Sequence, residues 1–221
     1  MSQRRSAFAV TEFYHIYNRG VDKRIIFIDD ADYERFIELL YLSNSTRAVN
    51  VRDIRDEFAS VFEFDQEEKL VAIGAYCLMP NHFHILVTPL LENGVQTFMR
   101  KVSTGYSMYF NKRYGRSGVL FQGRYKSERA DSDEYLKYLY SYIHLNPLKL
   151  IEKDWREIGL KNIPGAQAYL DSYHFSSYSD YCNSEREERK ILDSIRFPVY
   201  FANREEFLAE INSWLSYRKF P

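Results

Sequence analysis

Two histidines separated by one residue are the first side chains in this sequence that could bind a metal ion. His82 and His84 flank Phe83 in a run, HFHILVT, whose aromatic and β-branched residues predict a strand. Residues i and i+2 of a strand point to the same side, so both imidazoles share a face with Leu86. Imidazoles at this spacing can share one divalent ion. Two ordinary histidines on a solvent-facing strand are the alternative that this pair alone leaves open.

A tyrosine and an asparagine form the second pair of chemical interest. Tyr142 and Asn146 are four residues apart, and therefore neighbours on one face of a helix predicted to end at Pro147. A tyrosine hydroxyl is a weak nucleophile near pH 7 unless a metal ion or a base assists it. A metal ion held by the two histidines would polarise a phosphodiester and stabilise charge in the transition state. Together the two pairs predict covalent phosphodiester exchange. When the helix is considered alone, the alternative is a half-buried tyrosine and an asparagine that merely ends the helix.

Charge is distributed unevenly along the chain. Lys and Arg number 30 and Asp and Glu number 31, a formal net charge of −1, which excludes a strongly basic tail protein and a strongly acidic solvating one. Residues 100–129 nevertheless hold eight Lys or Arg and one Glu, whereas residues 51–69 carry a net charge of −4. Aromatic residues interleave with the cations of the basic segment, a combination that suits single-stranded nucleic acid. A solvated helix face with a charged hairpin is the alternative.

Composition places the chain among ordinary globular proteins. Of its 221 residues 45% are hydrophobic and 28% charged, and no apolar run approaches 18 residues. No apolar stretch follows the first charged residues, so no signal peptide and no membrane partner are expected, and the two cysteines, Cys77 and Cys182, fit a reduced compartment. A cytoplasmic protein, nucleoid-associated when bound to DNA, is the expectation.

Periodicity and turn residues predict an α+β fold. The expected order is strand, helix, strand, strand, helix, strand and helix, in the ranges 11–19, 31–44, 69–78, 82–88, 93–114, 119–130 and 132–146. Such an order indicates a mostly antiparallel sheet with helices packed mainly on one face. Residues 45–68 are expected to be mostly loop. Beyond residue 150 the pattern predicts a loop-rich stretch and two helical stretches, near 185–195 and 204–217.

Five sequence motifs carry a resemblance to a known family. The chain resembles the single-tyrosine HUH transposases (His-hydrophobic-His), and specifically the REP-associated tyrosine transposases. The match runs through most of the first 180 positions, and the final 40 or so residues match nothing in that family. The motifs are residues 14–20 (YHIYNRG), 76–87 (YCLMPNHFHILV), 118–126 (GVLFQGRYK), 142–147 (YIHLNP) and, more weakly, 175–181 (FSSYSDY).

The resemblance implies a ferredoxin- or RRM-like sheet and the cleavage and rejoining of single-stranded DNA, often beside a hairpin. Tyr142 falls on the family's nucleophile, which would form a 5′-phosphotyrosine and release a 3′-hydroxyl. His82 and His84 fall on the paired ligands of Mg²⁺ or Mn²⁺, and Asn146 falls where a polar third ligand stands. It also implies a catalytic domain over residues 1–150 and an extension over 151–221, loop-rich and then helical, packed on the same domain.

Six further residues are predicted to contact DNA. His15 lies on a motif strand that could neighbour the histidine pair, so it is a rival third ligand, a DNA contact or a hydrogen-bonded strand histidine. Basic residues would bind phosphates, which position a strand but do not specify its sequence. The predicted set is His15, Arg19, Arg100, Lys101, Arg124 and Lys126.

Three other functions are compatible with the same sequence. A binding module could recognise hairpin or single-stranded DNA without cutting it, although the intact Tyr142, His82 and His84 argue against lost chemistry. An RNA-binding protein could use the same sheet, and a metal hydrolase could use the histidines without the tyrosine. A homodimer is possible, because relatives act both as monomers and as dimers that share active sites.

Overall fold

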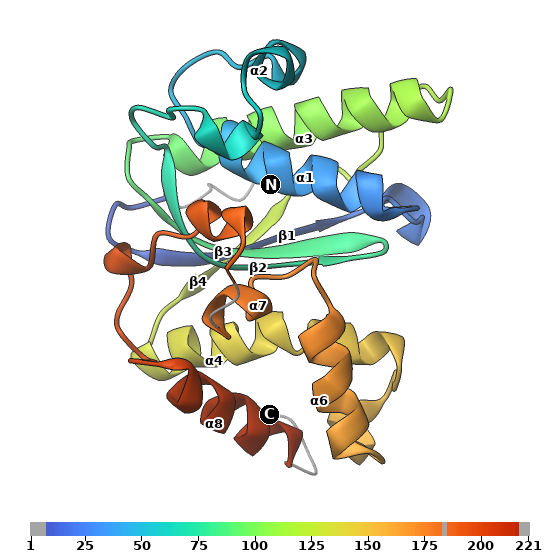
Figure 1. Cartoon of the computed structure of the whole chain (residues 1–221), viewed down its shortest axis with the longest axis vertical. Helices are drawn as coiled ribbons and strands as arrows, with labels where there is room; N and C mark the ends of the chain where they lie inside the picture. The colour runs from blue at the N-terminus through green and yellow to red at the C-terminus, as the bar shows by residue number, and fades with distance from the viewer. Residues whose placement is uncertain (1–7, 183–184, 217–221) are drawn as a thin grey trace, which may run out of the picture.

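A four-stranded antiparallel sheet forms the centre of the molecule (Figure 1). The computed structural model describes residues 8–182 and 185–216. The strand order is β2-β3-β1-β4, and every neighbouring pair is antiparallel. The strands are β1 (Phe13–Arg19), β2 (Val71–Met79), β3 (His82–Pro89) and β4 (Lys126–Ala130). The predicted α+β fold with an antiparallel sheet is confirmed.

Helices cover both faces of this sheet (Figure 1). One face carries α1 (Asp30–Leu42), α2 (Val51–Glu57) and α3 (Gly94–Arg113). The opposite side carries α4 (Asp133–His144), α5 (Trp155–Ile158), α6 (Ile163–Ser172), α7 (Tyr178–Tyr181) and α8 (Arg204–Leu215). The second face is therefore less open than the sequence suggested, because every residue of β2 is buried and its apolar side chains on both faces need cover.

Strand alternation divides the interior into two cores. Phe83, Ile85 and Val87 pack toward α1 and α3, whereas Leu86 packs in a second cluster with Leu139 of α4. In β2 the pairing register shifts between Ile73 and Ala75. This bulge lies at Gly74, where a Cβ atom would come within 2.8 Å of the Phe197 ring, so a larger residue would clash.

The helix that carries Tyr142 begins as the sequence predicts. The Ser132 side chain accepts a hydrogen bond from the backbone N–H of Tyr135 at 3.1 Å, which caps α4. Leu136, Leu139, Tyr140 and Ile143 are buried on one side of the helix, as its periodicity predicts. The packing of this face fixes the rotation of α4 and hence the direction of Tyr142.

The predicted strand over residues 119–130 is mostly wrong. Only its end, β4, pairs as a strand, and the segment before it is a loop with a single bridge between Gly20 and Phe121. Gly118 and Gly123 have φ angles of +87° and +70°, a conformation that interrupts an extended strand. The loop folds back on β1, where the Gln122 N–H donates to the Arg19 carbonyl at 2.8 Å.

Two predictions for the C-terminal part also need correction. The helix expected near 185–195 is replaced by short 3₁₀ turns at Glu187–Ile191 and Ser194–Arg196, because the Asp193 N–H between them donates to the Ile73 carbonyl of β2 at 2.9 Å. The stretch expected to be loop-rich contains α6, which Asn162 caps. Helix α8 follows the second prediction, although its expected end at residue 217 lies outside the described residues.

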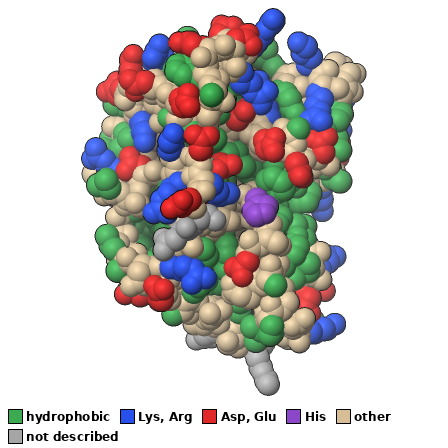
Figure 2. Space-filling view, viewed as in Figure 1, with side chains coloured by type: hydrophobic (Ala, Val, Ile, Leu, Met, Phe, Trp, Pro, Cys, Tyr) green, Lys and Arg blue, Asp and Glu red, His purple; other side chains and the backbone are tan. Residues whose placement is uncertain are grey.

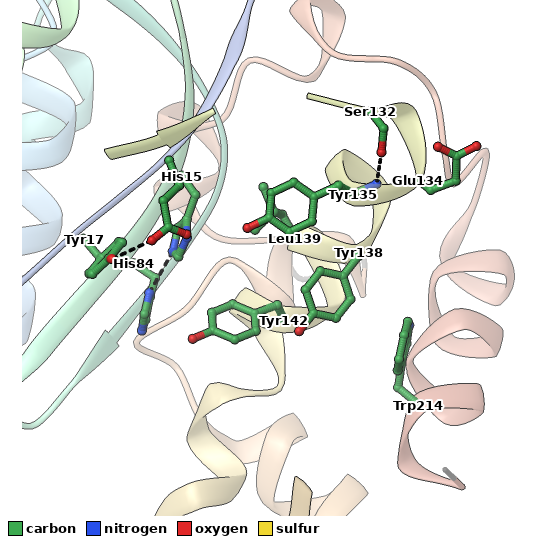
Figure 3. A pocket seen from close by; sticks show the side chains of 11 residues that line it. His15, Tyr17, His84, Ser132, Glu134, Tyr135, Tyr138, Leu139, Tyr142 and Trp214 are labelled. Atoms are coloured by element: carbon green, nitrogen blue, oxygen red, sulfur yellow. Dashed lines mark hydrogen bonds between the residues drawn. The ribbon is translucent and has the colours of Figure 1, made fainter. Parts of the chain in front are cut away.

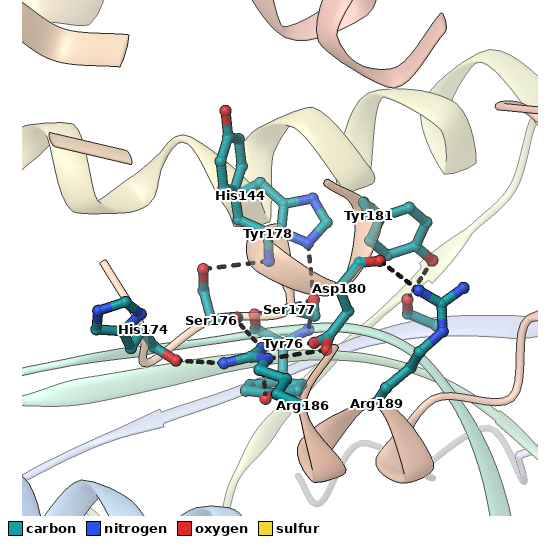
Figure 4. A network of polar contacts seen from close by, with 11 residues as sticks. Tyr76, His144, His174, Ser176, Ser177, Tyr178, Asp180, Tyr181, Arg186 and Arg189 are labelled. Atoms are coloured by element: carbon teal, nitrogen blue, oxygen red, sulfur yellow. Dashed lines mark hydrogen bonds and ion pairs between the residues drawn. The ribbon is translucent and has the colours of Figure 1, made fainter. Parts of the chain in front are cut away.

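The C-terminal segments pack against the sheet edge and α4. The Ser177 N–H donates to the Tyr76 carbonyl, and the Leu78 N–H donates to the Phe175 carbonyl, both at 2.9 Å, so this segment covers the exposed edge of β2. Arg186 then joins the Asp180 carboxylate to neighbouring backbone carbonyls (Figure 4). A third apolar cluster includes Leu148, Trp155 and Phe207. The boundary at residue 150 between a catalytic domain and a C-terminal extension stays a prediction.

Lys, Arg, Asp and Glu side chains intermix on the molecular face shown in Figure 2. This mixture agrees with the net charge of −1. Among the described residues no helix is long and apolar enough to cross a membrane.

Candidate functional site

The histidine pair lies at the start of β3, on the face toward α4. The ring centroids of His82 and His84 are 5.0 Å apart, with planes at 88°. His84 Nδ1 is 2.8 Å from Nε2 of His15 on β1, and His82 Nδ1 is 2.6 Å from Oδ1 of Asn81. Each Nδ1 is thus engaged by a neighbour, which leaves both Nε2 atoms for another ligand when the Nδ1 atoms carry the protons.

Burial keeps these imidazoles neutral. It lowers the pKa of His82 and of His15 to about 4, and it lowers the pKa of His84 well below its usual value. All three are therefore uncharged at pH 7. A neutral imidazole is the form that binds a metal ion.

Tyr142 lies between the histidines and a guanidinium group. Its ring centroid is 5.6 Å from those of both His84 and His15, and Figure 3 shows the phenol directed from α4 toward β3. The Arg156 guanidinium carbon stands 4.3 Å from the centre of the Tyr142 ring, and its Nη2 donates to the Tyr142 carbonyl at 3.3 Å. These contacts hold the ring beside the histidine pair.

Asn146 offers an unused acceptor in the same place. Its Nδ2 donates to the Tyr142 carbonyl at 2.8 Å, just beyond the end of α4. Its Oδ1 is buried and, within the described part of the chain, has no hydrogen-bond partner. An unsatisfied buried acceptor costs on the order of 1–3 kcal/mol, so a ligand that offers this oxygen a partner would gain from the contact. It lines one cavity together with His82 and His84.

These donors fit a metal ion only in part. Among residues 8–182 and 185–216 no three His, Cys, Asp or Glu side chains form a group that could hold a metal. Two imidazoles and the Asn146 amide oxygen would therefore need further oxygen ligands, from water or from a phosphate. The Oδ1 atom of Asn146, which has no hydrogen-bond partner among the described residues, could serve as one ligand of such an ion.

Two cavities of opposite character meet at Tyr142. The smaller, about 350 Å³, is lined by the cations Arg19, Lys23, Lys126 and Lys149 and by no acid. The larger, about 830 Å³, is lined by aromatic rings and two glutamates and by no Lys or Arg. Tyr17, His84 and Tyr142 line both. We call them the cationic cavity and the aromatic cavity.

Two motifs that are far apart in the sequence meet at the rim of the cationic cavity. Arg19 Nε donates to Oε1 of Gln122 at 2.5 Å, and Asn18 Nδ2 donates to the Gly123 carbonyl at 3.2 Å. Gly20 is required at this junction, because a Cβ atom there would stand within 2.8 Å of three atoms of Arg24 and Ile26. This junction directs Arg19 toward the histidine face.

The predicted DNA contacts separate into two groups. Arg19 and Lys126 line the cationic cavity, whereas Arg100 and Arg124 line another cavity on the α3 side of the β4 edge. Lys101 donates instead to the carbonyls of Ser45 and Arg47, at 2.5 and 2.6 Å, so its ammonium group fixes a loop.

His15 is 4% exposed and contacts His84, so its surroundings fit a support for the histidine pair better than an exposed DNA contact. Sequence reasoning missed Tyr17, Lys149, Arg156 and Trp214, which also line the site or touch Tyr142. Two of these had a signal, because Tyr17 lies inside the YHIYNRG motif and Lys149 follows the YIHLNP motif by two residues. The others reach the site through packing between distant segments.

Comparison with known families gives a direct match. The family described as "Transposase IS200 like" matches residues 33–146, just over half of the chain, including both histidines, Tyr142 and Asn146. The chain belongs to this family. It is accordingly a transposase-type, DNA-processing protein, which confirms the resemblance found in the sequence. The matched range does not include His15 or Arg19.

One solved structure supports the fold. A REP-associated tyrosine transposase bound to a REP hairpin aligns over 92% of both chains, with 14% identity and a TM-score of 0.52, so the two chains share a fold. A transposase-like protein from Deinococcus radiodurans R1 covers 65% of this chain and 95% of its own, with 17% identity and a TM-score of 0.32. No curated protein matches the chain.

Proposed function

We propose that this IS200-like family member nicks and rejoins single-stranded DNA through a 5′-phosphotyrosine on Tyr142, with help from a divalent metal ion. The observation that carries the proposal is the position of Tyr142. Its ring stands 5.6 Å from the ring of His84, between the buried histidines and the Arg156 guanidinium.

The covalent step follows from this placement. The Tyr142 oxygen attacks the scissile phosphorus, an O–P bond forms, and the bond from phosphorus to the 3′ oxygen breaks. The phenol loses its proton and the leaving 3′ oxygen gains one, so that a free 3′-hydroxyl remains. Attack by a 3′-hydroxyl on the phosphotyrosine reverses these bond changes and rejoins the strand.

Other residues of the chain bind and orient the reactants. Arg19, Lys126 and Lys149 line the cationic cavity, where they would hold the phosphates on either side of the scissile one. Arg156 holds the Tyr142 ring, and His15 fixes the orientation of His84. Fixed geometry of this kind lowers the activation free energy of strand cleavage, because the reacting groups lose less entropy on reaching the transition state.

The metal ion would bind His82, His84 and the free Oδ1 of Asn146. It would polarise the scissile phosphate and stabilise the charge that develops there. Mg²⁺ prefers oxygen ligands, so this donor set favours Mn²⁺ and binds Mg²⁺ weakly without a phosphate.

Hairpin DNA is the substrate that we propose. The solved relative with a similar fold is described with a REP hairpin bound, and the cations of this chain are arranged to receive a strand. Arg100 and Arg124 share a cavity on the α3 side, and Lys126 follows at the β4 edge toward Tyr142. A strand that passes this edge would meet cations on both sides, so binding should weaken steeply as salt increases.

A covalent-adduct assay tests the proposed function. Labelled oligonucleotides from hairpin repeats beside the gene are mixed with protein and Mn²⁺ or Mg²⁺ and separated on a denaturing gel. Wild type should form a metal-dependent adduct that a chelator prevents and Tyr142→Phe abolishes. Tyr138→Phe, which alters a phenol one helical turn away, is the matched control and should retain the adduct. Cleavage by Tyr142→Phe would favour a hydrolase, and hairpin binding with no adduct in wild type would favour a binding module.

A further inference from the structure

The aromatic cavity is larger than the cationic cavity and has no role in the chemistry described above. It lies on the opposite side of Tyr142 and is built from β1, β3, β4, α4 and α8 (Figure 3). Its volume of about 830 Å³ lies within the range of roughly 300–1,000 Å³ that is typical of ligand sites. Its lining therefore needs an explanation of its own.

Aromatic rings form a continuous wall in this cavity. The ring of Tyr138 is 5.8 Å from that of Tyr142 and 5.9 Å from that of Tyr135. Trp214 of α8 closes the wall, with its ring 5.4 Å from Tyr138. All four rings line the cavity and are partly exposed, a lining that suits a flat ligand.

Trp214 is held in place by its own helix. Its indole Nε1 donates to Oε1 of Glu210 at 2.8 Å, and Lys137 of α4 pairs with the same carboxylate at 2.8 Å. The polar atom of the indole is satisfied and the helix is tied to α4, so the ring is fixed at the cavity as a stacking surface. This contact gives α8 a role in the site.

Two carboxylates give the cavity its charge. Glu128 accepts a hydrogen bond from the Tyr17 hydroxyl at 2.7 Å and has acceptor capacity left, because a carboxylate can accept about four hydrogen bonds. Glu134 lines the cavity and forms no ion pair within the described ranges. Carboxylates repel phosphates and accept hydrogen bonds from amines, so this side of Tyr142 suits a base and not the backbone.

We infer that the aromatic cavity takes one unstacked base of the DNA strand, a base with an exocyclic amine, beside the phosphate that Tyr142 attacks. The base stacks on the wall of Tyr138 and Trp214, and its amine donates to Glu128 or Glu134. Adenine, cytosine or guanine fits this description, and thymine, which has no exocyclic amine, does not. The inference rests on the proposed function, because Tyr142 lines both cavities and thereby places a nucleotide between them.

Binding of short oligonucleotides without metal tests this inference separately from cleavage. The probes are fluorescein-labelled pentamers of deoxyadenosine, deoxycytidine, thymidine and an abasic sugar, followed by fluorescence anisotropy. Wild type should bind the adenine and cytosine pentamers at least about fivefold more tightly than the thymine pentamer, and the abasic pentamer most weakly. The intrinsic tryptophan fluorescence should change with the base-bearing probes, because Trp155 is buried and Trp214 is partly exposed.

Three variants and one control locate the preference. Trp214→Leu should bring all pentamers near the affinity of the abasic one, whereas Trp214→Phe should retain part of the preference. A double variant, Glu128→Gln with Glu134→Gln, should bring the ratio of adenine to thymine affinity toward one. Glu92→Gln removes an exposed acid outside this cavity and should leave that ratio unchanged.

The outcomes separate the two proposals. Equal affinity for thymine and adenine pentamers in wild type, or an unchanged ratio in both Trp214→Leu and the double glutamine variant, would overturn the base site even if the covalent adduct forms. A base preference that these variants remove would support the base site even if no adduct forms, in which case the nicking proposal alone fails.

Discussion

Two polar clusters of the described residues differ in how completely their buried groups are satisfied. In one, Asp180 and Arg186 join the segment after α6 to β2 (Figure 4). Both carboxylate oxygens of Asp180 accept from Arg186, at 2.8 and 2.5 Å, and the guanidinium also donates to the carbonyls of His174 and Ser176. The carboxylate of Asp180 and the guanidinium of Arg186 thus find their countercharge and their hydrogen-bond partners within the chain.

The cluster around Tyr142 is not balanced in this way. Asn146 has a buried oxygen without a donor, and no ion pair of the described residues includes Arg19, Lys126 or Lys149. Buried polar groups are normally paired, so the unpaired Asn146 oxygen is suited to a partner that arrives with a ligand. The three cations are exposed and can meet phosphates at the surface. The first cluster therefore supports the fold, whereas the second keeps groups that a bound ligand could engage, as the proposed function requires.

The largest expected effect is on stability, in the paired cluster. Arg186→Met should lower the free energy of unfolding by about 3–5 kcal/mol, because it leaves Asp180 buried without a countercharge. Denaturant titration measures the loss, and the adduct yield of the protein that remains folded should be unchanged. A loss below about 1 kcal/mol would show that the pair does not support the fold.

The next effect is on chemistry, in the unpaired cluster. His82→Ala should lower the rate of adduct formation by about 10²–10³-fold, a loss typical of removing one group that stabilises transition-state charge. Its stability should change little because His82 is partly exposed. His174→Ala is the matched control, since that exposed side chain is outside both cavities. Equal rates for the two variants would remove His82 from the site.

A smaller effect should follow from the residue behind His84. His15→Ala should weaken Mn²⁺ binding by about 10–100-fold, because groups that orient a metal ligand have effects of this size. His15→Gln can restore the hydrogen bond to His84 and should recover part of the affinity. Calorimetric titration with Mn²⁺ measures both, and no recovery by glutamine would indicate that His15 acts by packing alone.

Acid should destabilise the fold through its buried histidines, in the Tyr142 cluster and beside Ser177 near the paired cluster. Burial lowers the pKa of His15 to about 4 and of His144, which is 2.7 Å from Ser177 Oγ, to about 3. Depressed pKa values mean that the unfolded chain binds these protons first, near pH 6.5. The stability is therefore complete above that pH and is lost as pH falls from 6.5 toward 3–4. Each histidine should contribute a loss of about 1–2 kcal/mol between pH 7 and 5, measured by denaturant titration, and His144→Gln should reduce the slope.

The site could be predicted from the sequence where one periodic element carries it. Strand alternation sets His82 and His84 on one face, and helix periodicity turns Tyr142 away from the core side of α4. Arg156 and Trp214 could not be found in this way, because the packing of distant segments brings them to Tyr142 and its cavity. The same limit applies to the loop before β4, whose positive-φ glycines determine a path that alternation does not reveal.

Assignment of the attached nucleotide to one tyrosine is the most direct test of the nicking mechanism. The DNA adduct is trimmed with nuclease and digested with trypsin, which should release residues 138–149 as one peptide containing Tyr138, Tyr140 and Tyr142. Fragmentation in the mass spectrometer then identifies the modified residue. A phosphonucleotide on Tyr142 is the expected result, and one on Tyr138, Tyr140 or Tyr17 would contradict the mechanism.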